Sequence, residues 1–530
     1  MKVQICLILV ASLAAPTSGG EPLPVTATAP LAPTAVESVA LDTLVARAIE
    51  PATSPAVKLT LPEALARALE NNRTLAVRRL DPAIARARLM QEEGAFDDAL
   101  TLQVQRQHAK NPTASSLAGA NVSESDTRTG NLGFRTRLRD GSALTFNANN
   151  QRNESNSRFQ TLNPSFVSNL SVSLTKPLLR DSGDAATAGV SVAANAVEQA
   201  RLRLRKQLID TLAAVERQYW DLVFARQDRE VKRFSLEAAK SLLDLNLARR
   251  QSGLGSDVQV VEAETTRATR TDDLEVTGRI VADAQEILRR QLSLADVPPG
   301  AELVPVQVPA QLPSEAPLDA SLVDAFQRRP DRLDAVVELA NRDIRLEFLR
   351  NQKLPRVDLV ASYAQNGLAG GFGSALDTAA GGDFPGYTVG LQVEIPLEGR
   401  SARGNYQAGV LEKKQALLNL KAIEDQIQEE VTRAVRTLGT DLRRVEVSRR
   451  GAELAQRQLA AAEERYRQGL IANFDLLRFQ QDLADARSRA LRSVVDAKKS
   501  AVALDAATGR LLEARGVLVE EPSESKAPAR

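Results

Sequence analysis

The side chains that most often perform chemistry are scarce in this chain of 530 residues. It contains one histidine, His108, and one cysteine, Cys6. A Ser-His-Asp triad and a zinc site both need such groups close together, and one histidine supplies neither. No glycine-rich phosphate loop occurs, and acidic pairs such as Glu92-Glu93 stand among charged residues typical of solvated helices. The sequence therefore predicts no enzyme, no cofactor and no metal site.

The overall charge gives no reason to expect nucleic acid as a partner. The 68 basic and 67 acidic residues leave a formal net charge of +1. Proteins that bind nucleic acid usually carry a basic excess.

The N-terminus has the pattern of a secretory signal. Lys2 precedes an apolar run, residues 3–15, that is too short to span a bilayer. We therefore expect a signal peptide at residues 1–20, followed by a flexible leader at 21–57 that is rich in Pro, Ala and Thr. After residue 20 no stretch of about 18 apolar residues follows, which excludes an ordinary membrane-spanning helix. Any membrane insertion would have to use a barrel.

The elements that remain fall into two similar halves. We expect a first strand-and-helix repeat at residues 58–296, a Pro-rich linker at 297–317, a second repeat at 318–514 and a flexible tail at 515–530. Pro177 and Pro396 mark corresponding points, 396 − 177 = 219 residues apart, and Gly253 and Gly469 mark another, 469 − 253 = 216 apart.

Each half contains one very long helical stretch. Residues 186–252 and 401–468 lack proline and are rich in Ala, Leu, Arg, Glu and Gln. Each stretch could extend about 100 Å at 1.5 Å per residue. Polar residues after the glycines at 253 and 469 suggest that each helix reverses there into a hairpin.

Six short runs alternate apolar and polar residues, as strands with two different faces do. They are residues 100–105, 131–139, 143–150, 169–175, 356–363 and 387–395. The alternation alone fits a soluble sandwich or a sheet that faces lipid. The signal peptide and the long polar segments at 109–130, 153–166 and 365–385 favour lipid. Asp140-Gly141 predicts a tight hairpin turn.

Because these features follow one another in this order along the chain, and do so twice, residues 59–514 resemble the TolC-like outer membrane efflux protein family. The motifs are LPEALARALENN, VERQYWDLVFAR, PLLRDSG, PLEGRSARG and the two glycine turns. The resemblance implies an α+β membrane protein in which three copies form a transmembrane β-barrel continuing into a long α-helical coiled-coil barrel. It implies an outer-membrane exit duct of a tripartite efflux pump or a type I secretion system. A periplasmic adaptor, an inner-membrane transporter and outer-membrane lipid are the implied partners. The cargo stays open among drugs, metal ions, small molecules and proteins.

The resemblance also implies site residues at the far end of the helical hairpins, in the periplasm. The tip that meets the adaptor corresponds to Gly253, Leu254, Asp257, Gly469 and Leu470. The closing aperture corresponds to Tyr466 as a linking tyrosine and Asp475 as an acidic ring, with Gln259 and Glu262 at the equivalent places of the first repeat. Arg478 stands where a second acidic ring is expected, so it removes the double constriction, and an ion pair with Asp475 is one alternative. The glycines could equally be ordinary helix caps.

The first repeat carries extra residues between its opening helix and its proline. Leu61 to Pro177 spans 116 residues, whereas Leu318 to Pro396 spans 78. We expect residues 131–150 to insert into the sheet as a hairpin, which would give 18 rather than 12 barrel strands per trimer. Arg135, Arg137 and Arg139 would then face the lumen and favour anions. Alternatively, the hairpin lies outside the wall.

Two other classes of protein are alternatives. A periplasmic adaptor usually carries one hairpin flanked by a small β domain, whereas this chain has two hairpins. A structural coiled-coil envelope protein would lack the amphipathic strands.

Overall fold

The computed structural model describes residues 56–113, 122–253, 255–294, 298, 301–306 and 312–517. The expected signal peptide, nearly all of the expected leader, Leu254 and residues 518–530 lie outside the described residues. Among the described residues, no helix has the length and apolar character needed to cross a membrane.

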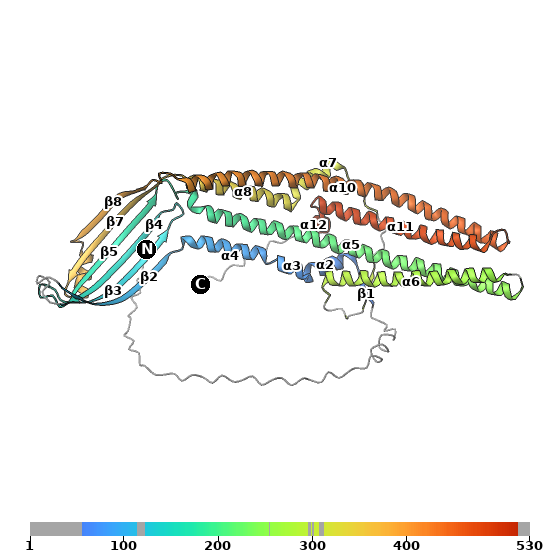
Figure 1. Ribbon diagram of the computed structural model, residues 1–530, viewed down its shortest axis with the longest axis horizontal. Coiled ribbons are helices and arrows are strands. Elements are labelled where there is room, and N and C mark those ends of the chain that lie inside the picture. The colour runs from blue at the N-terminus through green and yellow to red at the C-terminus, as the bar shows by residue number, and fades with distance from the viewer. Residues whose placement is uncertain are drawn as a thin grey trace, which may run out of the picture. The chain divides into compact units, whose positions relative to one another are not determined.

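Six antiparallel strands form one sheet in the order β2-β3-β4-β5-β7-β8 (Figure 1). The strands are β2 (Ala99–Pro112), β3 (Val122–Arg137), β4 (Ala143–Ser155), β5 (Ser165–Pro177), β7 (Arg356–Ala369) and β8 (Pro385–Glu394). Each of the six predicted alternating runs lies largely within one of these strands. Residues 131–150 belong to β3 and β4 inside the sheet, so the extra hairpin does not stand outside it.

The strands extend further than the alternation predicted. β2 reaches Pro112 and β3 begins at Val122, so much of the segment 109–130 is strand rather than loop. The segment 365–385 contains a helix, α9 (Phe372–Gly381). The prediction was wrong here because the outer halves of β2 and β3 carry charged residues, which hide the apolar period of two.

The turn at Asp140-Gly141 joins β3 to β4 beside the long helices. Gly141 has a φ of 90°, a conformation that glycine adopts readily. The backbone N–H of Leu138 donates to the carbonyl of Ser142 at 2.8 Å, and Gly183, just before the first long helix, donates to the carbonyl of Asp140 at 3.3 Å. The predicted tight turn is confirmed, and it lies at the junction of sheet and helices.

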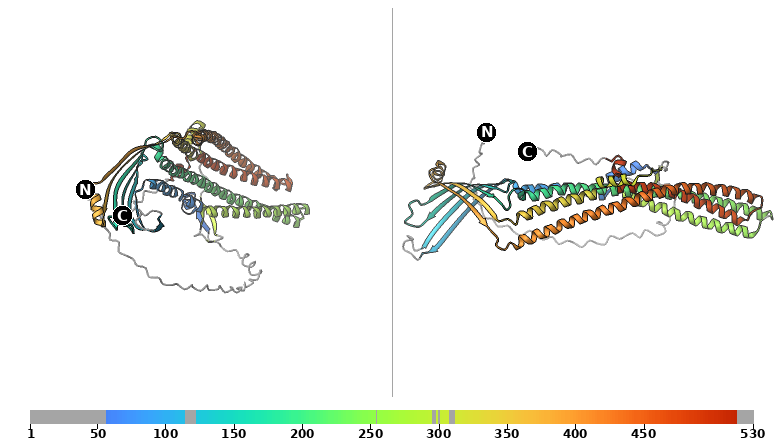
Figure 2. Two further views of the ribbon diagram at one scale, coloured as in Figure 1. Left: turned by 60° about the vertical axis from the view of Figure 1, so that its left-hand side comes forward. Right: turned by 90° about the horizontal axis from the view of Figure 1, so that it is seen from above.

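Two pairs of long helices run away from the sheet (Figures 1 and 2). They are α5 (Asp184–Gln251) with α6 (Asp257–Leu292), and α10 (Arg400–Arg467) with α11 (Asn473–Ala507). α5 and α10 each contain 68 residues. Their first residues are 400 − 184 = 216 apart, the offset that also separates Gly253 from Gly469. α4 (Asp81–Glu93) and α8 (Pro330–Asn351) pack against α5 nearer the sheet, and α8 also packs against α10.

Short elements surround the middle of the long helices. They are α2 (Leu61–Asn71), α3 (Arg73–Arg78), α7 (Leu318–Arg328), α12 (Leu511–Ala514), and two strands, β1 (Ala56–Leu59) and β6 (Glu302–Pro305), that pair in parallel. The 3-10 helix η1 (Gly94–Phe96) instead lies next to the sheet, between α4 and β2, and contacts β3. Thr60 begins α2 with a capping box, in which its hydroxyl accepts from the backbone N–H of Glu63 and the Glu63 carboxylate accepts from the N–H of Thr60.

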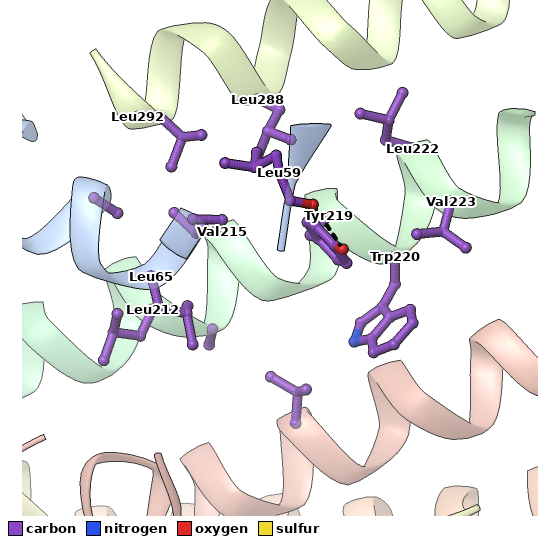
Figure 3. Close-up of a cluster of buried hydrophobic side chains, with 14 of the residues drawn as sticks. Leu59, Leu65, Leu212, Val215, Tyr219, Trp220, Leu222, Val223, Leu288 and Leu292 are labelled. Carbon is purple, nitrogen blue, oxygen red and sulfur yellow. Dashed lines mark hydrogen bonds between the residues drawn. The ribbon is translucent and has the colours of Figure 1, made fainter. Parts of the chain in front are cut away.

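The largest hydrophobic core lies at this level, around the middle of α5 (Figure 3). Leu212, Leu222 and Leu288 have no exposed surface. Each such side chain contributes roughly 2 kcal/mol by leaving water. Tyr219 is also buried, and its hydroxyl donates to the carbonyl of Leu59 at 3.1 Å.

The motif VERQYWDLVFAR holds three distant segments of chain on one helix. Besides Tyr219, which holds β1, Arg226 pairs with Glu302 of β6 at 2.6 Å. Glu216, 3% exposed, accepts two hydrogen bonds from Arg515, at 2.8 and 3.0 Å. The motif is therefore structural, and Arg515 is docked on α5.

A second ion-pair cluster joins α8 to α10. Arg329 bonds Asp331 at 2.5 Å and also bonds Glu430. Burial raises the pKa of both carboxyl groups, but the hydrogen bond and charge of Arg329 outweigh burial, so both pKa values lie below the ordinary range. Both groups are ionised at neutral pH.

Candidate functional site

One face of the sheet is apolar from strand to strand. A row of direct partners crosses all six strands and consists of Leu100, Phe134, Phe146, Val172, Tyr363 and Tyr387. Direct partners in antiparallel strands lie on the same face. The rings of Phe134 and Phe146 lie 6.0 Å apart. We call this side the apolar face.

The apolar face is exposed in the single chain over a considerable height. On β8 and just after it, alternate residues from Tyr387 to Ile395 are all at least half exposed, including Val389, Leu391 and Val393. The eight residue-to-residue steps from Tyr387 to Ile395 correspond to about 26 Å.

The opposite face is lined by amides and hydroxyls. A row of five amides, each the direct partner of the next, crosses five strands and consists of Gln103, Asn131, Asn149, Asn169 and Asn366. Asn169 donates to Asn366 at 2.9 Å. We call this side the polar face.

The three arginines singled out by the sequence lie near the helical end of β3. Arg135 and Arg137 alternate with Phe134 and therefore lie on the polar face. Arg139 lies beyond the end of β3, in the turn to β4. All three side chains are exposed.

At the end of the sheet remote from the long helices, the apolar face of β2 to β4 carries charged residues in place of apolar ones. Arg106 bonds Asp126 at 2.7 Å, and Lys110 bonds Glu124 at 3.0 Å. His108 lies among them, 3.4 Å from Glu124. We call this set the charged belt; its members are Arg106, His108, Lys110, Glu124, Asp126, Arg128, Arg152 and Glu154.

Neither edge of the sheet has a strand partner within the described part of the chain, since β2 and β8 stand at its two ends. Both edge strands expose apolar residues, such as Leu102 on β2 and Leu391 on β8. The helices repeat this arrangement: α4 carries Met90 at 72% exposure on one side, and α10 carries Leu411 at 66% on the other.

The two long hairpins reverse through the same backbone geometry. Gly253 and Gly469 have φ values of 72° and 73°. Gly253 donates to the carbonyl of Arg250, and Gly469 to that of Tyr466, each at 3.0 Å. The predicted reversals at glycine are confirmed. Leu470 is 68% exposed beside the second turn.

Near these turns a buried polar network joins all four long helices. Tyr466 of α10 donates to Asn246 of α5 at 2.9 Å, and Asn246 donates to Asn473 of α11 at 3.0 Å. Asn473 in turn donates to Glu262 of α6 at 3.0 Å. Tyr466, Asn246 and Asn473 are each less than 5% exposed. Arg249 stacks over the Tyr466 ring at 4.8 Å. We call these hydrogen-bonded residues the tip network.

Two residues predicted for the aperture serve as helix caps. The Gln259 side chain accepts from the N–H of Ser256 at 3.2 Å, and the Asp475 carboxylate accepts from the N–H of Ala472 at 3.4 Å. These positions correspond in the two hairpins, since 475 − 259 = 216. Gln259 also joins the tip network, because its backbone carbonyl accepts from the Asn246 side chain at 3.3 Å.

Asp475 and Arg478 do not form the ion pair that was one alternative. Within the described residues no such pair lies within 4 Å; Asp475 instead caps the first turn of α11, where it satisfies a backbone N–H. Arg478 lines a groove between α6 and α11 together with Glu262 and the exposed Val258 and Phe474. Asp257 is exposed and pairs with Arg250 at 3.4 Å.

The family resemblance predicted Tyr466 and Glu262 as site residues, but not the asparagines that connect them. Asn246 lies inside a long polar helix, where an asparagine usually faces water. Its partners are 220 and 227 residues away. Asn473 is one of the polar residues after the Gly469 turn, and these predicted only that the helix reverses there. A single sequence offers no local signal for such contacts.

Among the described residues, no group of three or more His, Cys, Asp or Glu is arranged to hold a metal ion.

Comparison with known proteins agrees with this geometry. Residues 322–510 match the family described as "Outer membrane efflux protein". The chain is 24% identical over 330 residues to the outer membrane efflux protein BepC of Brucella suis, which covers 61% of this chain and 68% of BepC.

Solved structures share the fold. The Campylobacter jejuni CmeC outer membrane channel superposes with a TM-score of 0.63 at 16% identity, covering 85% of this chain and 86% of CmeC. The open state of the Neisseria gonorrhoeae MtrE outer membrane channel superposes with a TM-score of 0.60 at 16% identity, covering 85% and 89%.

Proposed function

We propose that this chain is a TolC-like outer membrane efflux protein and forms a homotrimeric exit duct that passes substrate from an inner-membrane transporter across the periplasm and the outer membrane. The observation that carries the proposal is a sheet with one apolar and one polar face, continuous with long helical hairpins, whose two edge strands have no strand partner within the described residues. Such an element is incomplete alone, because free edges and an exposed apolar face are costly in a single soluble chain.

Three copies would satisfy both edges. Pairing β8 of one copy with β2 of the next closes a barrel of 18 strands, since each copy contributes six. The same rotation would bring the exposed apolar residues of α10 toward α4 and α6 of the neighbouring copy and would continue the wall as a tube of helices. A cyclic trimer repeats one such junction three times.

In this assembly the apolar face meets outer-membrane lipid, and the polar face lines the lumen. The apolar height of about 26 Å along β8 is of the order of the lipid-facing band of outer-membrane barrels. The row of amides would then form a polar, uncharged ring inside, and Arg135 and Arg137 would add positive charge near its periplasmic end. Anions would pass this end more readily than cations.

The hairpin turns would lie in the periplasm and meet an adaptor. Gly253, Leu254 and Asp257 of the first turn and Gly469 and Leu470 of the second are the proposed contact residues. The exposed Leu470 supports this role, because an exposed apolar residue next to a tight turn offers a small docking surface.

The tip network would hold the duct narrow. It ties the second hairpin to the first through Tyr466, Asn246, Asn473 and Glu262, and the hydrogen bonds that Asn246 makes to Tyr466 and Asn473 are shielded from water. Opening would require the hydrogen bonds between these residues to be replaced by hydrogen bonds to water. Asp475 and Arg478 would act near the same level, the first through its cap and the second through the groove beside Glu262.

The purified full-length chain, reconstituted in planar bilayers, tests the proposal. We expect stepwise conductance and, in detergent, a trimer that dissociates on heating. A monomeric protein without conductance would contradict it. A periplasmic adaptor or coiled-coil protein would remain in the soluble fraction of the cell envelope.

A further inference from the structure

The short helix α9 occupies an unusual place on the sheet. It connects β7 to β8 but packs over β5 and β7, away from both free edges. In the right-hand view of Figure 2 it is the short gold helix at the end of the sheet remote from the long helices. Its buried residues are Ala375 and Ala379, one turn apart.

α9 lies on the apolar face. Gly367 belongs to this face, since it follows Tyr363 at an even spacing on β7. A Cβ at Gly367 would collide with the backbone of α9 at Ala375 and Ala379. Ser168, the direct partner of Gly367, is only 1% exposed. The glycine thus permits the helix to sit directly on the sheet.

α9 lies where the apolar residues of the apolar face end, on the side of the sheet remote from the long helices. The row that contains Gly367 ends at Val104 on β2, and the next row outward contains three arginines that are partners of one another: Arg106, Arg128 and Arg152. α9 therefore lies at the boundary where the apolar face gives way to the charged belt.

The sides of α9 differ in polarity. At about 100° per residue, Phe372 and Leu376 lie on one flank of the buried stripe, and Ser374 and Thr378 lie on the other. Its single charged residue is Asp377. Phe372 is 51% exposed, and Phe384, just after the helix, is 59% exposed. Aromatic side chains at such a boundary favour the membrane interface.

We propose that α9 is an interfacial helix whose Phe372 flank inserts into the outer leaflet of the membrane, on the outside of the duct. The helix is continuous with the apolar face that the proposed function assigns to lipid, and the inference rests on that function. The lipid partner fits because the exposed residues of α9 are mostly small or apolar, whereas the charged belt at the same level provides the polar contacts on β2 to β4.

Spin labels in the lipid-reconstituted, full-length chain test this placement. With Cys6→Ser as background, nitroxides are attached to Phe372→Cys, Ser374→Cys, Leu391→Cys on the apolar face and Leu368→Cys on the polar face. Collision with oxygen, which concentrates in lipid, is compared with collision with a water-soluble nickel chelate. We expect position 372 to give an oxygen-to-nickel ratio close to that at 391 and above those at 374 and 368.

Each outcome has a separate meaning. If positions 372 and 374 both give the low ratio of position 368 while 391 gives a high one, α9 is a water-exposed loop cover and the inference is overturned. If position 391 also gives a low ratio, the apolar face does not meet lipid, and the proposed function fails first. A high ratio at 372 with a low ratio at 374 supports the interfacial orientation.

Discussion

The hydroxyl of Tyr466 donates a hydrogen bond to the side-chain oxygen of Asn246 at 2.9 Å, across 220 residues of sequence. This bond joins the second hairpin to the first in a place almost free of water. The positions 216 residues earlier than Tyr466 and Asn473 carry Arg250 and Asp257, which form an exposed ion pair instead. The two hairpins thus share their backbone turns but not the chemistry beside them.

Tyr466→Phe should weaken the tip network. It removes the hydroxyl and leaves Asn246 with an unsatisfied buried oxygen, a cost of about 1–3 kcal/mol. We expect reconstituted channels to open more often or to conduct more current. Tyr406→Phe is the matched control, because Tyr406 contacts Lys353 through its ring. Equal conductance in both variants and the wild type would show that the bond does not hold the tip closed.

A charge on the apolar face should block membrane insertion. Leu391→Arg places a guanidinium among exposed apolar residues, at a cost of about 2–4 kcal/mol at the bilayer midplane. Gln392→Arg, the next residue, lies on the polar face and should be tolerated. The amount of heat-dissociable trimer formed in lipid vesicles measures both. Similar yields from the two variants would contradict the assignment of the faces.

The cluster around Arg329 should make stability sensitive to acid. The pKa values of Asp331 and Glu430 are lowered, so their contribution is complete above about pH 4 and is lost as the pH falls through the lowered values. Asp210, whose pKa burial raises, acts in the opposite direction. Glu430→Gln should therefore flatten the fall in Tm between neutral and acid pH.

The neighbouring Glu429 provides the control for this experiment. It pairs with Arg433, and both side chains are 69% exposed. Exposed pairs contribute little, so Glu429→Gln should leave the dependence of Tm on pH unchanged. An equal flattening in both variants would mean that the Arg329 cluster is not responsible.

The docking of Arg515 should matter more than that of Arg510. Arg515→Gln leaves the carboxylate of Glu216 buried without its bidentate partner, which costs about 3 kcal/mol or more. Arg510→Gln breaks an exposed pair with Asp324 and should cost under about 1 kcal/mol. Thermal unfolding and proteolysis of the C-terminal segment report both. Equal protection of the segment in the two variants would count against a structural role for Arg515.

The long helices and the strands were predictable because each depends on a local period. Stretches without proline predicted α5 and α10 to within two residues at each end, and alternation identified all six strands of the sheet. β1, β6 and α9 were missed. β1 and β6 are four residues each and exist because they pair with each other across 302 − 56 = 246 residues of chain. α9 depends on the bare backbone at Gly367.

Less of the candidate site was predictable. The family resemblance predicted Tyr466 and Glu262 as site residues, and Asn246 was missed. Gln259 and Asp475 were expected at an aperture, and the structure shows that each side chain also accepts from a backbone N–H at the start of a helix, which the capping-box spacing of Ser256 and Gln259 explains. Contacts between hairpins depend on how distant helices pack, and no period within either helix encodes this.

The arginines near the turn of β3 and β4 should set the ion preference of the duct. Arg135 and Arg137 lie on the polar face, and removing both charges by Arg135→Gln with Arg137→Gln should shift the reversal potential in a salt gradient toward cations. The shift should be largest at low ionic strength, where charges are screened least. Arg106→Gln with Arg128→Gln removes two arginines from the opposite face and should cause no shift. Channels that select cations before and after the first pair of substitutions would rule out an arginine-lined lumen.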